Sequence, residues 1–146
     1  MIIQEDICCT VSAEISCDAR RVFAFAADAS RVGGWALGSF GPIETDEQGV
    51  SKGISLFDRS PAWFTLDADE SRLIVDYHIG SQEARYPRIS VRVIPGDVLK
   101  KPASSCVLTM TAWRPADMDD LRWRRLCACH EAEVLMVKSQ VESEQE

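Results

Sequence analysis

The chain has 146 residues, of which 46% are hydrophobic and 27% are charged, and its formal net charge is −7 at pH 7. These values are typical of a single globular domain, here residues 1–146, that buries a core without needing a metal or a disulfide. The negative charge argues against nucleic acid as a partner, because binding to phosphate requires a basic surface.

The start of the chain, from Met1 to Asp6, has neither the basic region nor the apolar core of a secretory signal. No apolar run in the sequence reaches the length of a membrane span. We therefore expect a cytoplasmic protein whose six cysteines are thiols. The spacing of these cysteines does not suggest a disulfide framework.

Residues 6–16 alternate between apolar and polar side chains, which predicts a half-buried strand. Asp18 is expected to cap a helix that begins at Ala19. One side of that helix is apolar, with Val22, Phe25, Ala26 and Ala29. The pair Gly33-Gly34 ends the helix and precedes a tryptophan.

Between Leu37 and Trp113 the pattern predicts strands only, joined by turns rich in Asp, Gly and Pro. The expected strands are 37–45, 52–58, 62–67, 72–80, 86–94 and 104–113. The alternation in 72–80 places Tyr77 inward with the other apolar residues of its phase. It places Asp76 and His78 on the solvent side, facing Arg88 and Arg92 of the next strand.

Residues 117–142 are expected to form one long helix with two apolar stripes, followed by a frayed acidic tail at 142–146. The first stripe contains Met118, Leu121, Ala128, Cys129, Ala132, Leu135 and Met136. The second contains Trp123, Leu126, Cys127, Val134, Val137 and Val141. The sequence does not decide which stripe faces the sheet.

This order of elements, and the segment from Ala13 to Asp28 followed by Trp35, resemble the START-like superfamily. The superfamily is also called SRPBCC and includes polyketide cyclase/dehydrase-like and birch-pollen-allergen-like proteins. Its members often open with a strand, a short polar step, a Val-Phe or Val-Trp helix, an Asp and a Trp. Here Asp18-Ala19 stands where the family often has Ala-Pro.

The resemblance implies an α+β helix-grip fold, in which a curved seven-stranded antiparallel sheet, with two short helices, wraps around one long C-terminal helix. It also implies a hydrophobic cavity between the sheet and that helix. Members bind lipids, polyketides, sterols, quinones or plant hormones, and some catalyse aromatic cyclisation or hydrolysis. The fold does not choose among these functions.

Seven residues are candidate ligand contacts: Phe57, Trp63, Tyr77, Met110, Arg125, Cys129 and Ala132. If the first helical stripe faces the cavity, the Arg125 guanidinium would bind a ligand carboxylate or enolate. Otherwise Arg125 extends to solvent or pairs with a strand carboxylate. An inward Tyr77 hydroxyl would orient a carbonyl or act as a general acid, unless it bonds to the backbone.

Cys127, His130 and Glu131 share one helical face, but no second cluster completes a metal site, so no metal or other cofactor is expected. A hydrogen bond from His130 to a strand is the preferred alternative. Catalysis by a cysteine nucleophile is not expected, because neither His78 nor His130 is evidently beside a thiol.

The leading prediction is therefore a protein that binds a small hydrophobic ligand, aromatic, acyl or polyketide-like, between sheet and helix. One alternative is a cyclase, dehydratase or hydrolase that uses the same cavity, which a carboxylate and a tyrosine or histidine converging in an open pocket would favour. Another is an interaction module whose cavity is filled by side chains. The tryptophans also allow a homodimer, or else they cover the sheet rim.

Overall fold

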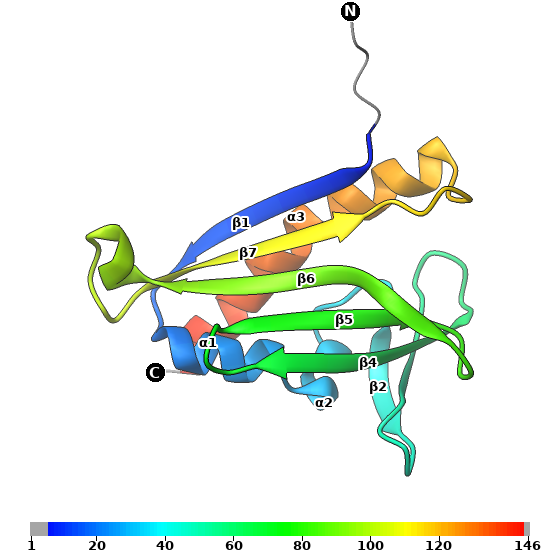
Figure 1. The fold of residues 1–146 in the computed structure, drawn as a ribbon, viewed down its shortest axis with the longest axis horizontal. Helices are drawn as coiled ribbons and strands as arrows, with labels where there is room; N and C mark the ends of the chain where they lie inside the picture. Colours follow the sequence, from blue (N-terminus) through cyan, green and yellow to red (C-terminus); the bar gives the residue numbers. More distant parts are fainter. Residues whose placement is uncertain (1–5, 145–146) are drawn as a thin grey trace, which may run out of the picture.

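The computed structural model describes residues 6–144 of the chain (Figure 1). The elements are, in order, β1 (Cys8–Ile15), α1 (Ala19–Ala26), α2 (Ala29–Val32), β2 (Phe40–Thr45), β3 (Ser51–Ile54), β4 (Pro61–Asp69), β5 (Ile74–Gly80), β6 (Arg85–Pro95), the 3-10 helix η1 (Gly96–Leu99), β7 (Cys106–Trp113) and α3 (Asp120–Ser143).

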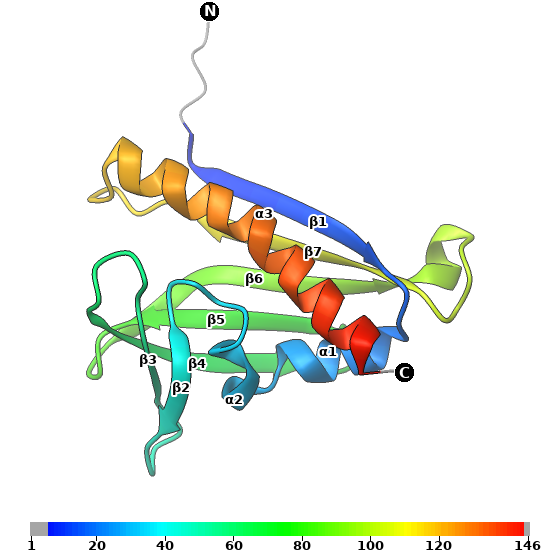
Figure 2. The same ribbon diagram turned by 180° about the vertical axis from the view of Figure 1, so that it is seen from behind.

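The strands form one seven-stranded antiparallel sheet in the order β1-β7-β6-β5-β4-β3-β2, so the first strand lies beside the last. Helix α3 crosses one face of the sheet, and α1 and α2 lie on the same face, near the C-terminal end of α3 (Figure 2). Strands β2 and β3 run steeply relative to β5 and β6. The predicted α+β helix-grip fold is therefore confirmed.

Two predicted strands lose three or more residues in the structure because turns replace their ends. The 37–45 strand begins only at Phe40, since the Ser39 N–H turns back to the Ala36 carbonyl at 3.2 Å. The 52–58 strand ends at Ile54, because Ser55 starts a turn. In that turn the Phe57 and Arg59 N–H groups donate to Ser55.

A β-bulge interrupts the pairing of β5 with β6. Tyr77 pairs with Ile89, but the next residue, His78, pairs with Pro87, so Arg88 is an extra residue in β6. Proline has no N–H to donate to the neighbouring strand, and an extra residue changes the direction of the side chains beside it. The expected position of Arg88 on the solvent side is therefore wrong, whereas Arg92 is exposed as expected.

Helix α3 packs its second apolar stripe against the sheet. Its buried side chains are Trp123, His130, Glu133, Val134, Val137 and Val141. The first stripe lies largely on the outer side, where Leu121 and Leu135 are 55% and 58% exposed. Arg125 and Ala132 are exposed there as well. The rotation of α3 thus places His130, and not Arg125, inside the molecule.

The segment before β2 closes one end of the core. Asp18 caps α1 by accepting a hydrogen bond from the Arg20 N–H at 2.9 Å, as predicted. Val22 and Trp35 are buried, and the Trp35 ring makes an edge contact with Tyr77, with centroids 5.8 Å apart. Gly33 allows the backbone of β2 to approach, because a Cβ on this residue would lie 1.8 Å from the Gly41 carbonyl oxygen.

The end of α3 is held by side-chain contacts. The helix continues to Ser143, where Glu142 accepts a hydrogen bond from the Ser16 N–H at 3.0 Å and Glu144 forms an ion pair with Arg31. The predicted fraying of this part of the acidic tail is therefore wrong, and residues 145–146 lie outside the described residues. Within residues 6–144, no helix is long and apolar enough to cross a bilayer.

The close approach at Gly33 predicts a specific loss of stability. Gly33→Ala forces a Cβ against backbone atoms of Gly41, so we expect the free energy of unfolding to fall by about 3 kcal/mol. Gly38→Ala is the matched control, because a Cβ there meets nothing within 4 Å. Urea unfolding of the three proteins checks this, and equal stability of the two variants would contradict the proposed contact.

Candidate functional site

A cavity of about 130 Å³ lies between the sheet and the N-terminal half of α3. Its floor is the sheet, which contributes Trp63 and Phe64 from β4, Ile79 from β5, Ile89 from β6 and Met110 from β7. These side chains make the floor apolar. Val32, Trp35 and Ala36, from α2 and the segment after it, close one side, and Trp113, Met118 and Leu126 add further apolar surface.

The most unusual polar feature of this cavity is a buried pair on α3. His130 Nδ1 lies 2.6 Å from Glu133 Oε1, and only 2% of His130 and 3% of Glu133 is exposed. The second carboxyl oxygen of Glu133 accepts a hydrogen bond from the Leu37 N–H at 3.1 Å. Because the two residues are three positions apart, just under one helical turn, their side chains meet on one face of the helix.

The other ring nitrogen, His130 Nε2, is buried and has no hydrogen-bond partner within the described residues. His130 and Glu133 both line the cavity. A carboxylate on Nδ1 orients the imidazole and fixes which nitrogen carries the proton, as in many acid–base sites. With Nδ1–H donating to Glu133, Nε2 presents a lone pair that accepts a hydrogen bond or a proton.

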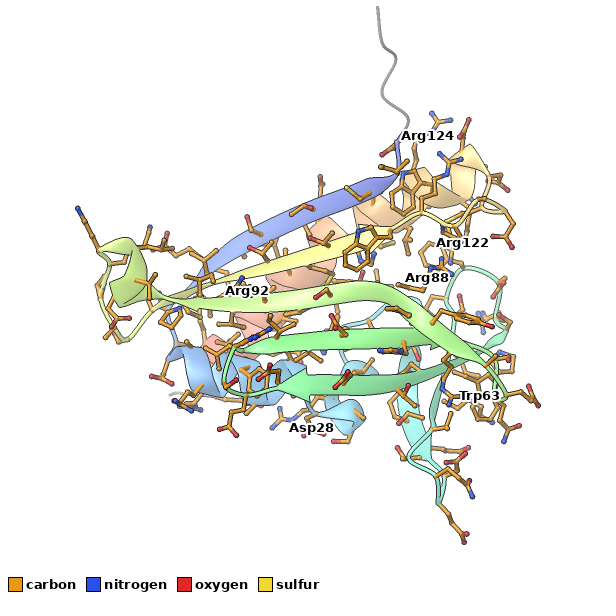
Figure 3. The ribbon with its side chains drawn as sticks, viewed as in Figure 1. Asp28, Trp63, Arg88, Arg92, Arg122 and Arg124 are labelled. Atoms are coloured by element: carbon orange, nitrogen blue, oxygen red, sulfur yellow. The ribbon has the colours of Figure 1, made fainter. Side chains whose placement is uncertain are left out.

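Two arginines line the cavity where β6 and the start of α3 meet. Arg88 comes from the bulge of β6, and Arg122 comes from the first turn of α3 (Figure 3). The Arg122 guanidinium carbon lies 3.7 Å from the centroid of the Phe57 ring. The β3–β4 loop that carries Phe57 therefore packs against the start of α3.

Tyr77 lines the cavity with its ring, but its hydroxyl is already used. The hydroxyl donates a hydrogen bond to the Ala26 carbonyl at 2.5 Å. Burial of the ring raises the pKa of the Tyr77 phenol far above its usual value. A general-acid role for this hydroxyl is therefore not supported, and the backbone-bonded alternative matches the structure.

The structure brings some of the predicted contact residues together and separates others. Trp63, Tyr77 and Met110 line the cavity, and Phe57 lies beside it under Arg122. Their role in ligand binding stays a prediction.

Three candidates on α3 do not line the cavity. Arg125 and Ala132 are exposed, and Cys129 is half-buried outside the lining. The expected placement of these three residues in the cavity is wrong, because the second apolar stripe of α3, and not the first, faces the sheet.

Burial makes two of the six thiols poor nucleophiles. Cys8, Cys9, Cys17, Cys106, Cys127 and Cys129 are all free. Burial raises the pKa of the Cys106 thiol to about 12, and burial with a contact to Cys9 does the same for Cys127. Such thiols stay protonated at neutral pH and are poor nucleophiles.

No metal centre is found within residues 6–144, because no group of three or more His, Cys, Asp or Glu side chains is placed to hold an ion. The predicted hydrogen bond from His130 to a strand is wrong, because the partner of His130 is Glu133 on the same helix.

Sequence reasoning missed Glu133, Arg88 and Arg122 as site residues, and it considered His130 only for a rejected metal cluster or for a hydrogen bond to a strand. One signal was available: His130 occupies a polar position in the middle of the second apolar stripe of α3. A polar residue on a buried stripe needs a partner, and Glu133 is one helical turn away. The bulge that turns Arg88 inward has one signal in the sequence, Pro87, because a proline inside a strand is typical of a sheet edge or a bulge.

Comparison with known proteins supports the fold. No protein-family model and no curated protein matches the sequence. Among solved structures, the protein XoxI from Bacillus cereus is 13% identical and has a TM-score of 0.72, with 96% of this chain and 99% of that one covered. A START superfamily protein from Mycobacterium smegmatis is 8% identical, with a TM-score of 0.67 and coverage of 94% and 99%.

A third structure, the Zhui aromatase/cyclase from Streptomyces sp. R1128, is 15% identical and has a TM-score of 0.66, with 95% of each chain covered. At such identities the likeness concerns the path of the backbone and leaves ligand and activity open. The similarity nevertheless extends over nearly the whole chain in all three cases. The chain therefore has the START-like helix-grip fold that its opening segment and order of elements indicated.

Proposed function

We propose that the protein binds a small, largely apolar ligand in the cavity between the sheet and α3. The observation that carries this proposal is an apolar-walled cavity whose lining residues hold a few buried polar atoms, such as His130 Nε2, that have no hydrogen-bond partner among residues 6–144. Small-molecule sites commonly combine apolar walls with a few polar groups that fix orientation. The START-like fold of the solved structures above supports the same interpretation.

The size of the cavity limits the ligand. An engineered apolar cavity of about 150 Å³ holds one benzene molecule. A cavity of about 130 Å³ therefore suits one aromatic ring or a short acyl chain. A polyketide-sized ligand would need more room than this cavity offers. The same open volume argues against the alternative of an interaction module whose interior is filled.

A variant that fills the cavity tests this proposal. Ala36 lines the cavity, so Ala36→Phe places a ring in the space that the ligand would occupy. We expect fluorobenzene to bind the unmodified protein and its affinity to fall about tenfold or more in the variant. Binding is measured by ¹⁹F NMR titration.

The matched control is Ala132→Phe, which adds the same ring on the exposed side of α3 and should leave the affinity unchanged. Thermal unfolding shows whether both variants are folded. If the unmodified protein does not bind fluorobenzene, or if folded Ala36→Phe binds it equally well, the cavity is not the site.

We propose as a second candidate an enzyme in which His130 is a general base. The observation that favours it is the buried His130–Glu133 pair with Nε2 free of any partner in the described structure. Nε2 would remove a proton from the carbon next to a ligand carbonyl, and the electron pair of the broken C–H bond would form the enolate. The imidazolium, stabilised by Glu133, would then return a proton to the same carbon or to a leaving group.

Hydrogen exchange detects this step without knowledge of the natural substrate. Acetophenone in D₂O should lose its methyl proton signal faster with the protein than with buffer, as measured by ¹H NMR. His130→Gln should lower the protein-dependent rate by about a hundredfold, to near the buffer rate. Glu131→Gln, at an exposed neighbouring position, should retain it. A rate with the unmodified protein equal to that of buffer would contradict the enzyme candidate.

A further inference from the structure

Arg88 and Arg122 are the two arginines among the residues that line the cavity. Within residues 6–144, neither side chain has a carboxylate within 4.0 Å, whereas Arg20, Arg31, Arg72 and Arg114 each form an ion pair. The Arg88 Nε and Arg122 Nη1 atoms are buried and have no hydrogen-bond partner among the described residues. Two guanidinium groups thus line an apolar cavity with donors unused.

The acidic groups around this pair are few and act only at a distance. Asp117 raises the pKa of Arg88, but burial and the charge of Arg122 lower it, with burial as the largest effect. Arg122 in turn helps to lower the pKa of Asp58 on the β3–β4 loop. The part of the cavity beside the two arginines therefore has a local positive charge, in a chain whose net charge is −7, while Glu133 lines the cavity further along α3. Buried donors of this kind are costly unless an acceptor is supplied.

Both side chains are held in place without such an acceptor. The Arg122 guanidinium packs over the Phe57 ring, a contact that supports a planar cation but leaves its edge donors free. Arg88 is directed to the cavity by the bulge opposite Tyr77 and His78. A pre-positioned pair of forked donors matches the oxygens of a carboxylate.

We propose that Arg88 and Arg122 bind the carboxylate of the ligand, so that the ligand is a small aromatic or acyl acid. This inference rests on the proposed function, because the apolar part of the acid would occupy the cavity. His130 lies about 12 Å further along the α3 axis than Arg122. An acid anchored by the arginines therefore extends its apolar body along the cavity toward His130.

The test compares benzoate with benzamide, which has the same ring and nearly the same shape but no charge. Isothermal titration calorimetry is carried out at low ionic strength. We expect benzoate to bind about tenfold more tightly than benzamide. Arg88→Met and Arg122→Met should each remove most of this preference and leave the benzamide affinity within about twofold.

Arg125→Met is the matched control, because Arg125 is exposed on the outer side of α3 and should not change either affinity. Arg122→Lys keeps the charge but loses the forked donors and should retain part of the preference. Thermal unfolding confirms that each variant is folded.

The outcomes separate the two proposals. If fluorobenzene and benzamide bind but benzoate binds no better, the carboxylate site is wrong while the cavity proposal stands. A preference for benzoate that persists in both methionine variants likewise overturns the assignment of Arg88 and Arg122. If none of the three aromatic probes binds, the proposed function itself fails, and the inference fails with it.

Discussion

A buried carboxylate must be paired, and Glu133 meets this requirement with two hydrogen bonds. One joins it to His130 on the same helix, and the other joins it to the backbone of Leu37, in the segment before β2. A charged group left unpaired in an apolar interior costs several kcal/mol, so these contacts strongly restrict how α3 can rotate. The inward position of His130, the outward position of Arg125 and the polar side of the cavity all follow from that rotation.

Local irregularities of the sheet then shape the cavity. The bulge in β6 directs Arg88 to the helix-covered face, and the turn at Ser55 brings Phe57 under Arg122. The close contact of Gly33 with Gly41 lets β2 approach the segment that carries Trp35. A regular sheet with ordinary hairpins would place none of these groups at the cavity. The regular strands and helices thus form the scaffold. The bulge, the turn and the close glycine contact then position the residues of the site.

Much of the fold could be predicted from the sequence, because the spacing of apolar residues and the capping of helices depend only on neighbouring residues. The alternation in 8–15, the cap at Asp18 and the long amphipathic helix each follow from neighbouring residues. The site could not be predicted in the same way. Both stripes of α3 are apolar, and tertiary contacts such as that of Glu133 with Leu37 select one. Arg88 follows a strict alternation in sequence, and the pairing with β5 reveals the extra residue.

The central claim, that the cavity between the sheet and α3 receives a ligand, is tested most directly by NMR of the methionine methyl groups. Met110 and Met118 line the cavity, whereas Met136 is half-buried on α3 outside it. During a titration with fluorobenzene, the Met110 and Met118 methyl signals should shift in a saturable way and that of Met136 should not. Saturable shifts confined to Met136, or no shift at any of the three, would contradict the account.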